Sequence, residues 1–258
     1  MPERVREGDA IPDLNEYSAG VVAYDLRALI ARFDTRFTEP GEGAVVGALS
    51  SLVGESLLLD LLADALHAAG STVRRLPGRP ARDNNAFAFA GMYKPKVRFL
   101  DGWLVLDDAA LTAVECKHWT SSSRSTGGWH YRTIGDDAAS YALEQWNLLQ
   151  KKHLRLEKWT DTNKIALPVR QPADWTGSMA NLRRILAIWT PISSDGHSYF
   201  SSATTTSPID GIYQDIPIEV FSGSLYARAL LARGHHHLDA TISGVHTRLD
   251  ALGALLRG

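Results

Sequence analysis

The stretch that most constrains the fold is Val97–Trp119, whose sequence VRFLDGWLVLDDAALTAVECKHW predicts two strands joined by a tight turn. The letters DDAA place the reversal near Asp108. Asp101 and Glu115 are equally far from Asp108, so an odd-length loop would set them opposite each other, with Cβ atoms roughly 5 Å apart. An even-length loop would instead put the two carboxylates on opposite faces of the sheet.

Strand alternation places Lys117 on the same face as Glu115. Two carboxylates that face each other repel unless a positive group neutralises them. Lys117 is one such group. A metal ion is another, because oxygen ligands suit Mg²⁺, which typically takes one or two carboxylates and keeps several waters. The alternative is an exposed sheet face with three unrelated charges, and the pattern Glu-x-Lys on its own would favour that alternative.

Asp101, thirteen intervening residues and then Glu115-Cys116-Lys117 on a strand resemble the active-site signature of the PD-(D/E)XK nuclease superfamily. The resemblance covers roughly residues 44–192, although the proline that often precedes the Asp is absent here. It implies an α/β fold with a restriction-endonuclease-like core (αβββαβ), in which helices flank a mixed central sheet. It also implies a nuclease that uses one or two divalent metal ions.

The resemblance assigns roles to the residues that match the signature. Asp101, Glu115 and the backbone carbonyl of Cys116 would hold Mg²⁺, for which Mn²⁺ could substitute. Lys117 would orient or deprotonate the attacking water and offset developing negative charge. Glu55 would be a further metal ligand, because the superfamily carries an acidic residue on its first helix.

Gly43–Ala69 is the strongest predicted helix, and Gly70 is its expected C-cap. On a helical wheel Glu55 lies on the apolar side, roughly 140° from the centre of a predicted solvent stripe that contains Ser56, Asp60, Asp64 and His67. A carboxylate on the apolar side is costly unless something compensates it. Glu55 would therefore reach solvent, pair with an arginine or point at the metal site.

A second core helix is predicted from Asp136 or Asp137 to about His153, and it carries Gln145. Some branches of the superfamily have a glutamine on this helix near the metal-bound water, which makes Gln145 a candidate catalytic residue. A glutamine on the flank of a helix, with no role in catalysis, is the alternative. Upstream, an arginine-rich stretch could grip phosphates or be a solvated loop; its members are Arg74, Arg75, Arg79 and Arg82.

Three regions are predicted: an N-terminal arm and helix over residues 1–42, a nuclease core over 43–233 and a C-terminal helix over 234–258. The remaining predicted elements are a helix at Val21–Phe37, strands at Ser71–Leu76 and Arg184–Ile192, a loop at Ser193–Pro208, an edge strand at Asp215–Ser222 and a helix at Leu225–Arg233. The C-terminal helix would begin at Leu238 with an a/d-type apolar seam. It would pack on its own domain or form a homodimer contact. Adjacent histidines at 235–237 lack the spacing of a zinc site.

Composition sets outer bounds on the function. The 258 residues are 45% hydrophobic and 22% charged with a net charge of −2, as in an ordinary globular protein without a global basic field. A single cysteine, no apolar run long enough to span a bilayer and no signal peptide predict a cytoplasmic protein without a membrane partner.

These observations predict a divalent-metal-dependent nuclease that hydrolyses phosphodiester bonds. Family frequency favours DNA over RNA as the partner, and an endonuclease of a bacterial restriction or phage-defence system as the setting. The alternative is a catalytically silent nuclease-fold protein that binds nucleic acid or a protein partner.

Overall fold

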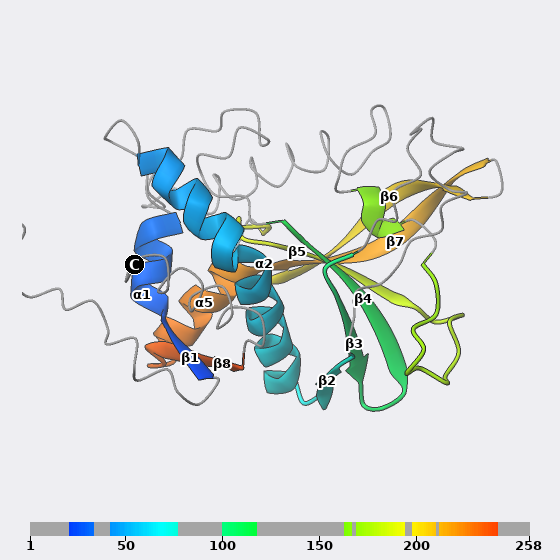
Figure 1. Cartoon of the computed structure of the whole chain (residues 1–258), viewed down its shortest axis with the longest axis horizontal. Coiled ribbons are helices and arrows are strands. Elements are labelled where there is room, and N and C mark those ends of the chain that lie inside the picture. Colours follow the sequence, from blue (N-terminus) through cyan, green and yellow to red (C-terminus); the bar gives the residue numbers. More distant parts are fainter. Residues whose placement is uncertain are drawn as a thin grey trace, which may run out of the picture.

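The computed structural model describes residues 21–33, 42–76, 100–117, 163–166, 169–193, 198–209 and 212–241. In these ranges the chain is a mixed α/β protein (Figure 1). Its elements are β1 (Val21–Asp25), α1 (Leu26–Phe33), α2 (Glu42–Ala68), β2 (Val73–Arg75), β3 (Gly102–Leu106), β4 (Ala110–Lys117), η4 (Asn163–Ala166), β5 (Arg183–Ile188), β6 (Phe200–Ile209), β7 (Ile212–Ser222), α5 (Gly223–Ala232) and β8 (His237–Thr241). None of the helices among the described residues is both long and apolar enough to cross a membrane.

Six strands form a mixed sheet in the order β2-β3-β4-β5-β7-β6. β4, β5 and β7 run parallel, and the remaining neighbours pair antiparallel. β1 and β8 form a separate two-stranded antiparallel sheet. In Figure 1 the helices α1, α2 and α5 gather on one side of the molecule, and the β6–β7 ribbon extends away from them.

Of the two loop lengths considered for the central hairpin, the structure has the odd one. Leu106 pairs with Ala110 across a loop of odd length, and Gly102 pairs with Val114. The Ala109 amide donates to the Leu106 carbonyl at 3.0 Å. Positive φ angles of 52° and 51° at the two loop aspartates give the turn the twist that suits a hairpin. Residues 101 and 115 therefore occupy equivalent positions on the two arms.

Each face of the large sheet has its own hydrophobic core. On the face toward α2 and α5 the strands contribute side chains such as Leu104, Val114, Ile185 and Phe221. The other face carries a second cluster that includes Trp103, Ala113, Leu186 and Val220, with Ile165 of η4 packed on it. Because side chains alternate along β4, Glu115 and Lys117 belong to the face of Ala113, as predicted, whereas Asp101 lies in the bend before β3.

Helix α2 matches the predicted helix closely, and it ends at Gly70, which has a φ of 98°. The predicted solvent stripe on this helix is correct for His67, which is exposed, and for Ser56 and Asp64 in part, since both are half-buried, but it is wrong for Asp60. Asp60 is only 7% exposed, and its carboxylate pairs with the Arg75 guanidinium on β2. Asp64 accepts a hydrogen bond from the Tyr226 hydroxyl at 2.5 Å. α2 contacts β2, β4, β5, α5 and β8, and its less buried positions include Glu55, Leu59, Ala63 and His67, which lie along one side of the helix.

The predictions for the two ends of the chain need correction. Residues 21–25, predicted as the start of a helix, form strand β1, and the described helix begins at Leu26 and runs to Phe33. Residues 237–241, predicted to open the C-terminal helix, form β8, which pairs with β1. This pairing joins opposite ends of the chain, so neither partner is visible in a local pattern. Residues 242–258 lie outside the described part.

The predictions around β6 and β7 were also partly wrong. Ser193–Pro208 was predicted as a loop, but Phe200–Ile209 is strand β6 at the edge of the sheet. β7 therefore lies between β5 and β6 and is not the edge strand that Pro217 suggested. The ladder with β5 begins at Glu219, so Pro217 lies beyond it and interrupts no hydrogen bond there. Strand β5 and helix α5 agree with the prediction.

Candidate active site

Strand β4 presents Glu115 and Lys117 from one face of the sheet. The Glu115 residue is only 3% exposed, and its Oε1 lies 2.6 Å from the Lys117 Nζ. β4 lies between β3 and β5, so the carboxylate is carried by a central strand. A charge at such a position requires a counter-ion, and Lys117 supplies one.

Asp101 reaches the same end of β4 from the bend immediately before β3. Its backbone amide donates to the Val114 carbonyl at 3.0 Å. Its carboxylate Oδ2 accepts a hydrogen bond from the Cys116 amide at 2.7 Å. The Asp101 carboxylate is therefore fixed beside the peptide that joins Glu115 to Cys116.

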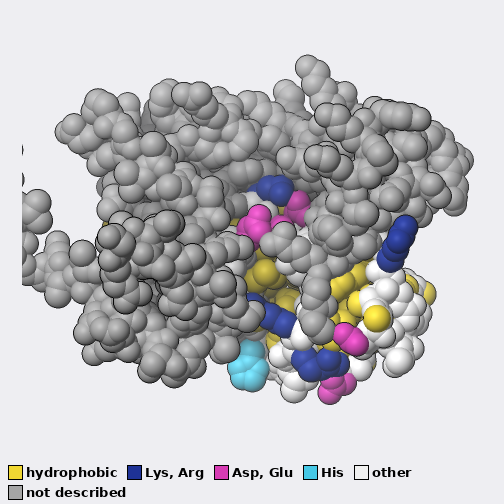
Figure 2. All heavy atoms as spheres, viewed as in Figure 1, with side chains coloured by type: hydrophobic (Ala, Val, Ile, Leu, Met, Phe, Trp, Pro, Cys, Tyr) yellow, Lys and Arg dark blue, Asp and Glu magenta, His cyan; other side chains and the backbone are white. Residues whose placement is uncertain are grey.

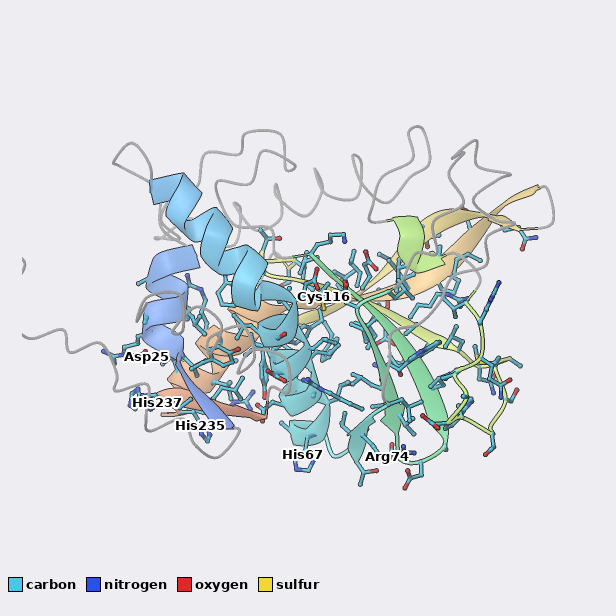
Figure 3. The ribbon with its side chains drawn as sticks, in the orientation of Figure 1. Asp25, His67, Arg74, Cys116, His235 and His237 are labelled. Carbon is cyan, nitrogen blue, oxygen red and sulfur yellow. The ribbon has the colours of Figure 1, made fainter. Side chains whose placement is uncertain are left out.

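The Cys116 side chain lies on the opposite face, where it belongs to the core beneath α2, and the residue is only 2% exposed. Figure 3 labels it in the central part of the molecule, near the end of β4. Burial raises the pKa of this thiol well above its usual value, and the carboxylates of Asp101, Glu115 and Glu55 raise it further. Lys117 acts in the opposite direction. Three acids and one lysine thus share the surroundings of Cys116.

Glu55 lies on α2 and is exposed, which corrects its predicted place on the buried side of the helix. The wheel was wrong because leucines surround α2 on most sides and Asp60 takes an inward position. The Glu55 carboxylate acts on the Cys116 thiol, whose pKa it raises. Figure 2 shows acidic and basic side chains near the centre of the view, next to hydrophobic ones.

The donors at the end of β4 fit the chemistry of a hard divalent ion. Asp101 and Glu115 supply carboxylate oxygens, which Mg²⁺ prefers, and one or two carboxylates completed by water are its usual protein ligands. Among the described residues, no group of three Asp, Glu, His or Cys side chains is arranged to hold a metal ion. A dedicated all-protein cage is therefore not what this part of the chain offers, whereas a two-carboxylate site agrees with its donors.

Two of the predicted basic residues, Arg74 and Arg75, do not join this cluster. Gln145 lies outside the described residues. The Arg75 guanidinium pairs with the Asp60 carboxylate. The Arg74 Nη2 lies 3.5 Å from Oδ1 of Asp108, an exposed residue at the hairpin turn. The ion pair between the buried Asp60 and the exposed Arg75 was missed because the Asp60 carboxylate was assigned to solvent. The one sequence signal for it is an arginine on the strand that follows the helix.

The run of histidines lies elsewhere. All three are exposed, and His237 is the cross-strand partner of Asp25. Figure 3 labels His235, His237 and Asp25 in one region, away from Cys116. The described residues include no metal-binding group there, so nothing connects this run with the candidate site.

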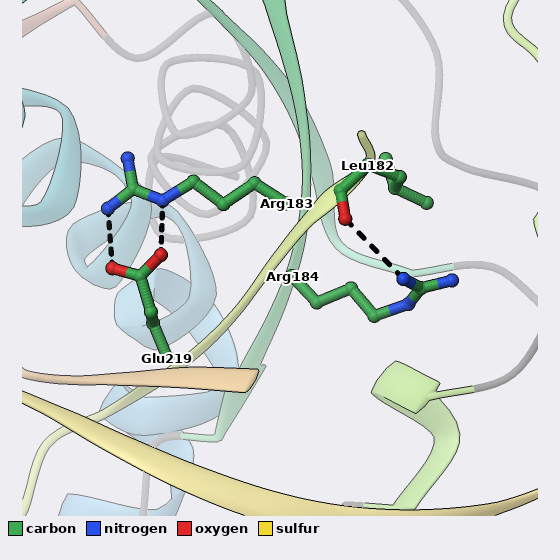
Figure 4. A network of polar contacts seen from close by, with 4 residues as sticks. All are labelled: Leu182, Arg183, Arg184 and Glu219. Carbon is green, nitrogen blue, oxygen red and sulfur yellow. Dashed lines mark hydrogen bonds and ion pairs between the residues drawn. The ribbon is translucent and has the colours of Figure 1, made fainter. Parts of the chain in front are cut away.

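A second polar group lies at the other end of β5. Arg183 donates from Nε and Nη2 to the two carboxylate oxygens of Glu219, both at 2.5 Å (Figure 4). A hollow of about 430 Å³ adjoins this pair between β5, β6 and β7. Ile188, at the opposite end of β5, pairs with Lys117. The hollow is therefore separate from the cluster on β4. The candidate active site is defined by the carboxylates of that cluster and not by the hollow.

In comparisons with known proteins, no family model, no curated protein and no solved structure matches the chain.

Proposed function

We propose that the chain is a divalent-metal-dependent nuclease whose active site is formed by Asp101, Glu115, Lys117 and Glu55. The observation that carries the proposal is the placement of Glu115 and Lys117 on β4 with the Asp101 carboxylate hydrogen-bonded to the peptide between them. Two acids and a lysine together can serve metal-dependent hydrolysis of a phosphodiester.

Asp101 and Glu115, with the backbone carbonyl of Cys116, would hold Mg²⁺ or Mn²⁺, and Glu55 would add a further carboxylate. The chemistry that the ion supplies when bound is activation of water and neutralisation of charge on the phosphate. Lys117 would orient the attacking water and offset negative charge that develops on the phosphate oxygens. Gln145 remains a candidate catalytic residue outside the described part.

A restriction-endonuclease-like core is the finer fold proposal. It is supported by the order α2, β2, β3, β4 and β5, which agrees with αβββαβ if the second helix falls within residues 118–162. The mixed sheet, with β4 and β5 parallel, is compatible with it. A DNA endonuclease of a restriction or phage-defence system is the corresponding proposal for substrate and setting. A homodimer through the C-terminal segment stays a prediction.

The test is cleavage of supercoiled plasmid, linear DNA and RNA by the purified protein with Mg²⁺, Mn²⁺ or EDTA. Glu115→Gln should lower the cleavage rate about 10²-fold or more, because it removes a carboxylate that would hold the metal ion. Glu219→Gln is a matched control, since Glu219 is also paired with a cation on a strand but lies outside the cluster. No cleavage of any substrate would favour a silent protein that binds nucleic acid. Equal activity of Glu115→Gln and the parent would refute the proposed site.

A further inference from the structure

In the candidate site Lys117 pairs with the Glu115 carboxylate, which a bound metal ion would also need as a ligand. The Glu115 side chain is only 4% exposed and the Lys117 side chain 22%, with 2.6 Å between Oε1 and Nζ. An ion pair in such a poorly hydrated place is held more strongly than one at the surface. The ammonium is thus a tightly bound counter-ion and not a passing contact.

A divalent ion bound to Glu115 would have to approach the same carboxylate. Mg²⁺ lies about 2.0–2.1 Å from its oxygen ligands, so an ammonium still hydrogen-bonded to this carboxylate would be left close to the ion. Two cations at that separation repel each other, and neither is screened effectively where water is scarce. Occupation by the ion and retention of the present ion pair therefore oppose each other.

We infer, on the basis of the function proposed above, that Lys117 competes with the divalent ion for Glu115. In the metal-free protein the lysine acts as a built-in counter-ion that keeps the buried carboxylate compensated. With an ion held by Glu115, the Lys117 ammonium would leave this carboxylate and would be available to the attacking water and the phosphate. One residue would therefore weaken metal binding and serve the chemical step.

The inference predicts that metal affinity and activity change in opposite directions when the lysine loses its charge. Lys117→Met should bind Mg²⁺ and Mn²⁺ about fivefold or more tightly than the parent, because a repelling and competing charge is gone. Lys117→Gln should do the same, and its amide can still donate to Glu115, which protects the fold if the methionine variant is unstable. Both variants should lose cleavage.

Binding is measured by titration calorimetry without nucleic acid and, independently, by the rise in melting temperature on adding each metal ion. Lys117→Arg keeps the charge and should remain within about twofold of the parent affinity. Arg183→Met is the matched control. It removes the positive charge that pairs with the Glu219 carboxylate at the far end of β5. The metal affinity of this variant should also stay within about twofold of the parent affinity.

The inference is supported if Lys117→Met and Lys117→Gln bind the metal ions more tightly than the parent, while Lys117→Arg and Arg183→Met do not. It is overturned if both variants bind metal as the parent does or more weakly, and it is also overturned if Arg183→Met gains as much affinity. In those cases Mg²⁺-dependent cleavage by the parent would leave the proposed function intact. If neither the parent nor any variant binds a divalent ion, the inference and the metal-dependent function fail together.

Discussion

The Asp101 carboxylate and the Cys116 amide form a 2.7 Å hydrogen bond just beyond the last pair of the β3–β4 ladder. The bond ties the bend before β3 to the end of β4. It uses Oδ2 of the carboxylate, so Oδ1 is the oxygen that this bond leaves for another ligand. Asp101 would thus have a structural role and a chemical role that mutations can separate.

Asp101→Asn keeps an oxygen that can accept from Cys116 but removes the negative charge. We expect the free energy of unfolding of this variant to stay within about 0.5 kcal/mol of the parent value. The variant should lose metal-dependent cleavage. Asp101→Ala also leaves the amide without its partner and should be about 1–3 kcal/mol less stable. Urea denaturation beside the plasmid assay checks both. A fully active asparagine variant would exclude Asp101 from the metal site.

Glu55→Gln tests whether the exposed acid on α2 contributes to the same site. Because Glu55 is exposed, its replacement should change the stability of the metal-free protein by no more than about 0.5 kcal/mol. If Glu55 is a ligand, the variant should need a higher Mg²⁺ concentration for half-maximal cleavage. The measurement is a Mg²⁺ titration of cleavage by parent and variant. An unchanged midpoint would remove Glu55 from the site.

Much of the site was predictable because it depends on a local turn. The odd loop after Leu106 is encoded by adjacent residues, and strand alternation then fixes which side chains share a face. The long helix α2 and its glycine cap were predictable for the same reason. The hydrogen bond from Cys116 to Asp101 was not, because it depends on a bend that the alternating pattern does not record.

Features that depend on distant partners could not be read from local patterns. The burial of Asp60 depends on Arg75 and on the β1–β8 sheet, which pairs segments from opposite ends of the chain. A helical wheel records the angle of a side chain and not what packs against it. Strand β6 is rich in serine and threonine, which is typical of a loop. Its pairing with the distant residues of β7 is what defines it as a strand.

Gly102 lets α2 approach the start of β3, beside Asp101. A Cβ at this glycine would lie 3.0 Å from a Leu59 methyl group, one turn along the helix from Glu55. Gly102→Val should therefore push the helix away, destabilise the fold by about 1–3 kcal/mol and lower cleavage. Gly102→Ala, which the flexible leucine can accommodate, should have a smaller effect on both. Equal stability of the valine variant and the parent would show that this approach is not tight.

The buried Asp60 makes a distinct prediction about pH. Burial raises the pKa of its carboxyl group from 3.8 to about 6, although Arg75 lowers it. The Asp60 Oδ2 and the Tyr24 hydroxyl are both buried without a hydrogen-bond partner, which agrees with a carboxylate that is poorly solvated. Nearby on α2, the Asp64 carboxylate is held by Tyr226 of α5.

The sign of the effect follows from the direction of this shift. Between pH 4 and 6 the folded protein keeps the Asp60 proton, whereas the unfolded chain releases it. The proton that the folded protein keeps on Asp60 therefore contributes its full stabilisation below about pH 4. This contribution is lost as the pH rises to about 6, and above that pH the titration of Asp60 no longer changes the stability. A rise from 3.8 to about 6 corresponds to about 3 kcal/mol.

Asp60→Asn should abolish this dependence, since an amide does not titrate. Subtracting the unfolding free energy of the variant from that of the parent, measured in urea at several pH values, should give a difference that falls by about 3 kcal/mol between pH 4 and 7. Arg75→Met should move the fall to higher pH, because the arginine no longer lowers the Asp60 pKa. A difference that is flat with pH, or that rises, would show that the Asp60 carboxylate is well compensated in the folded protein.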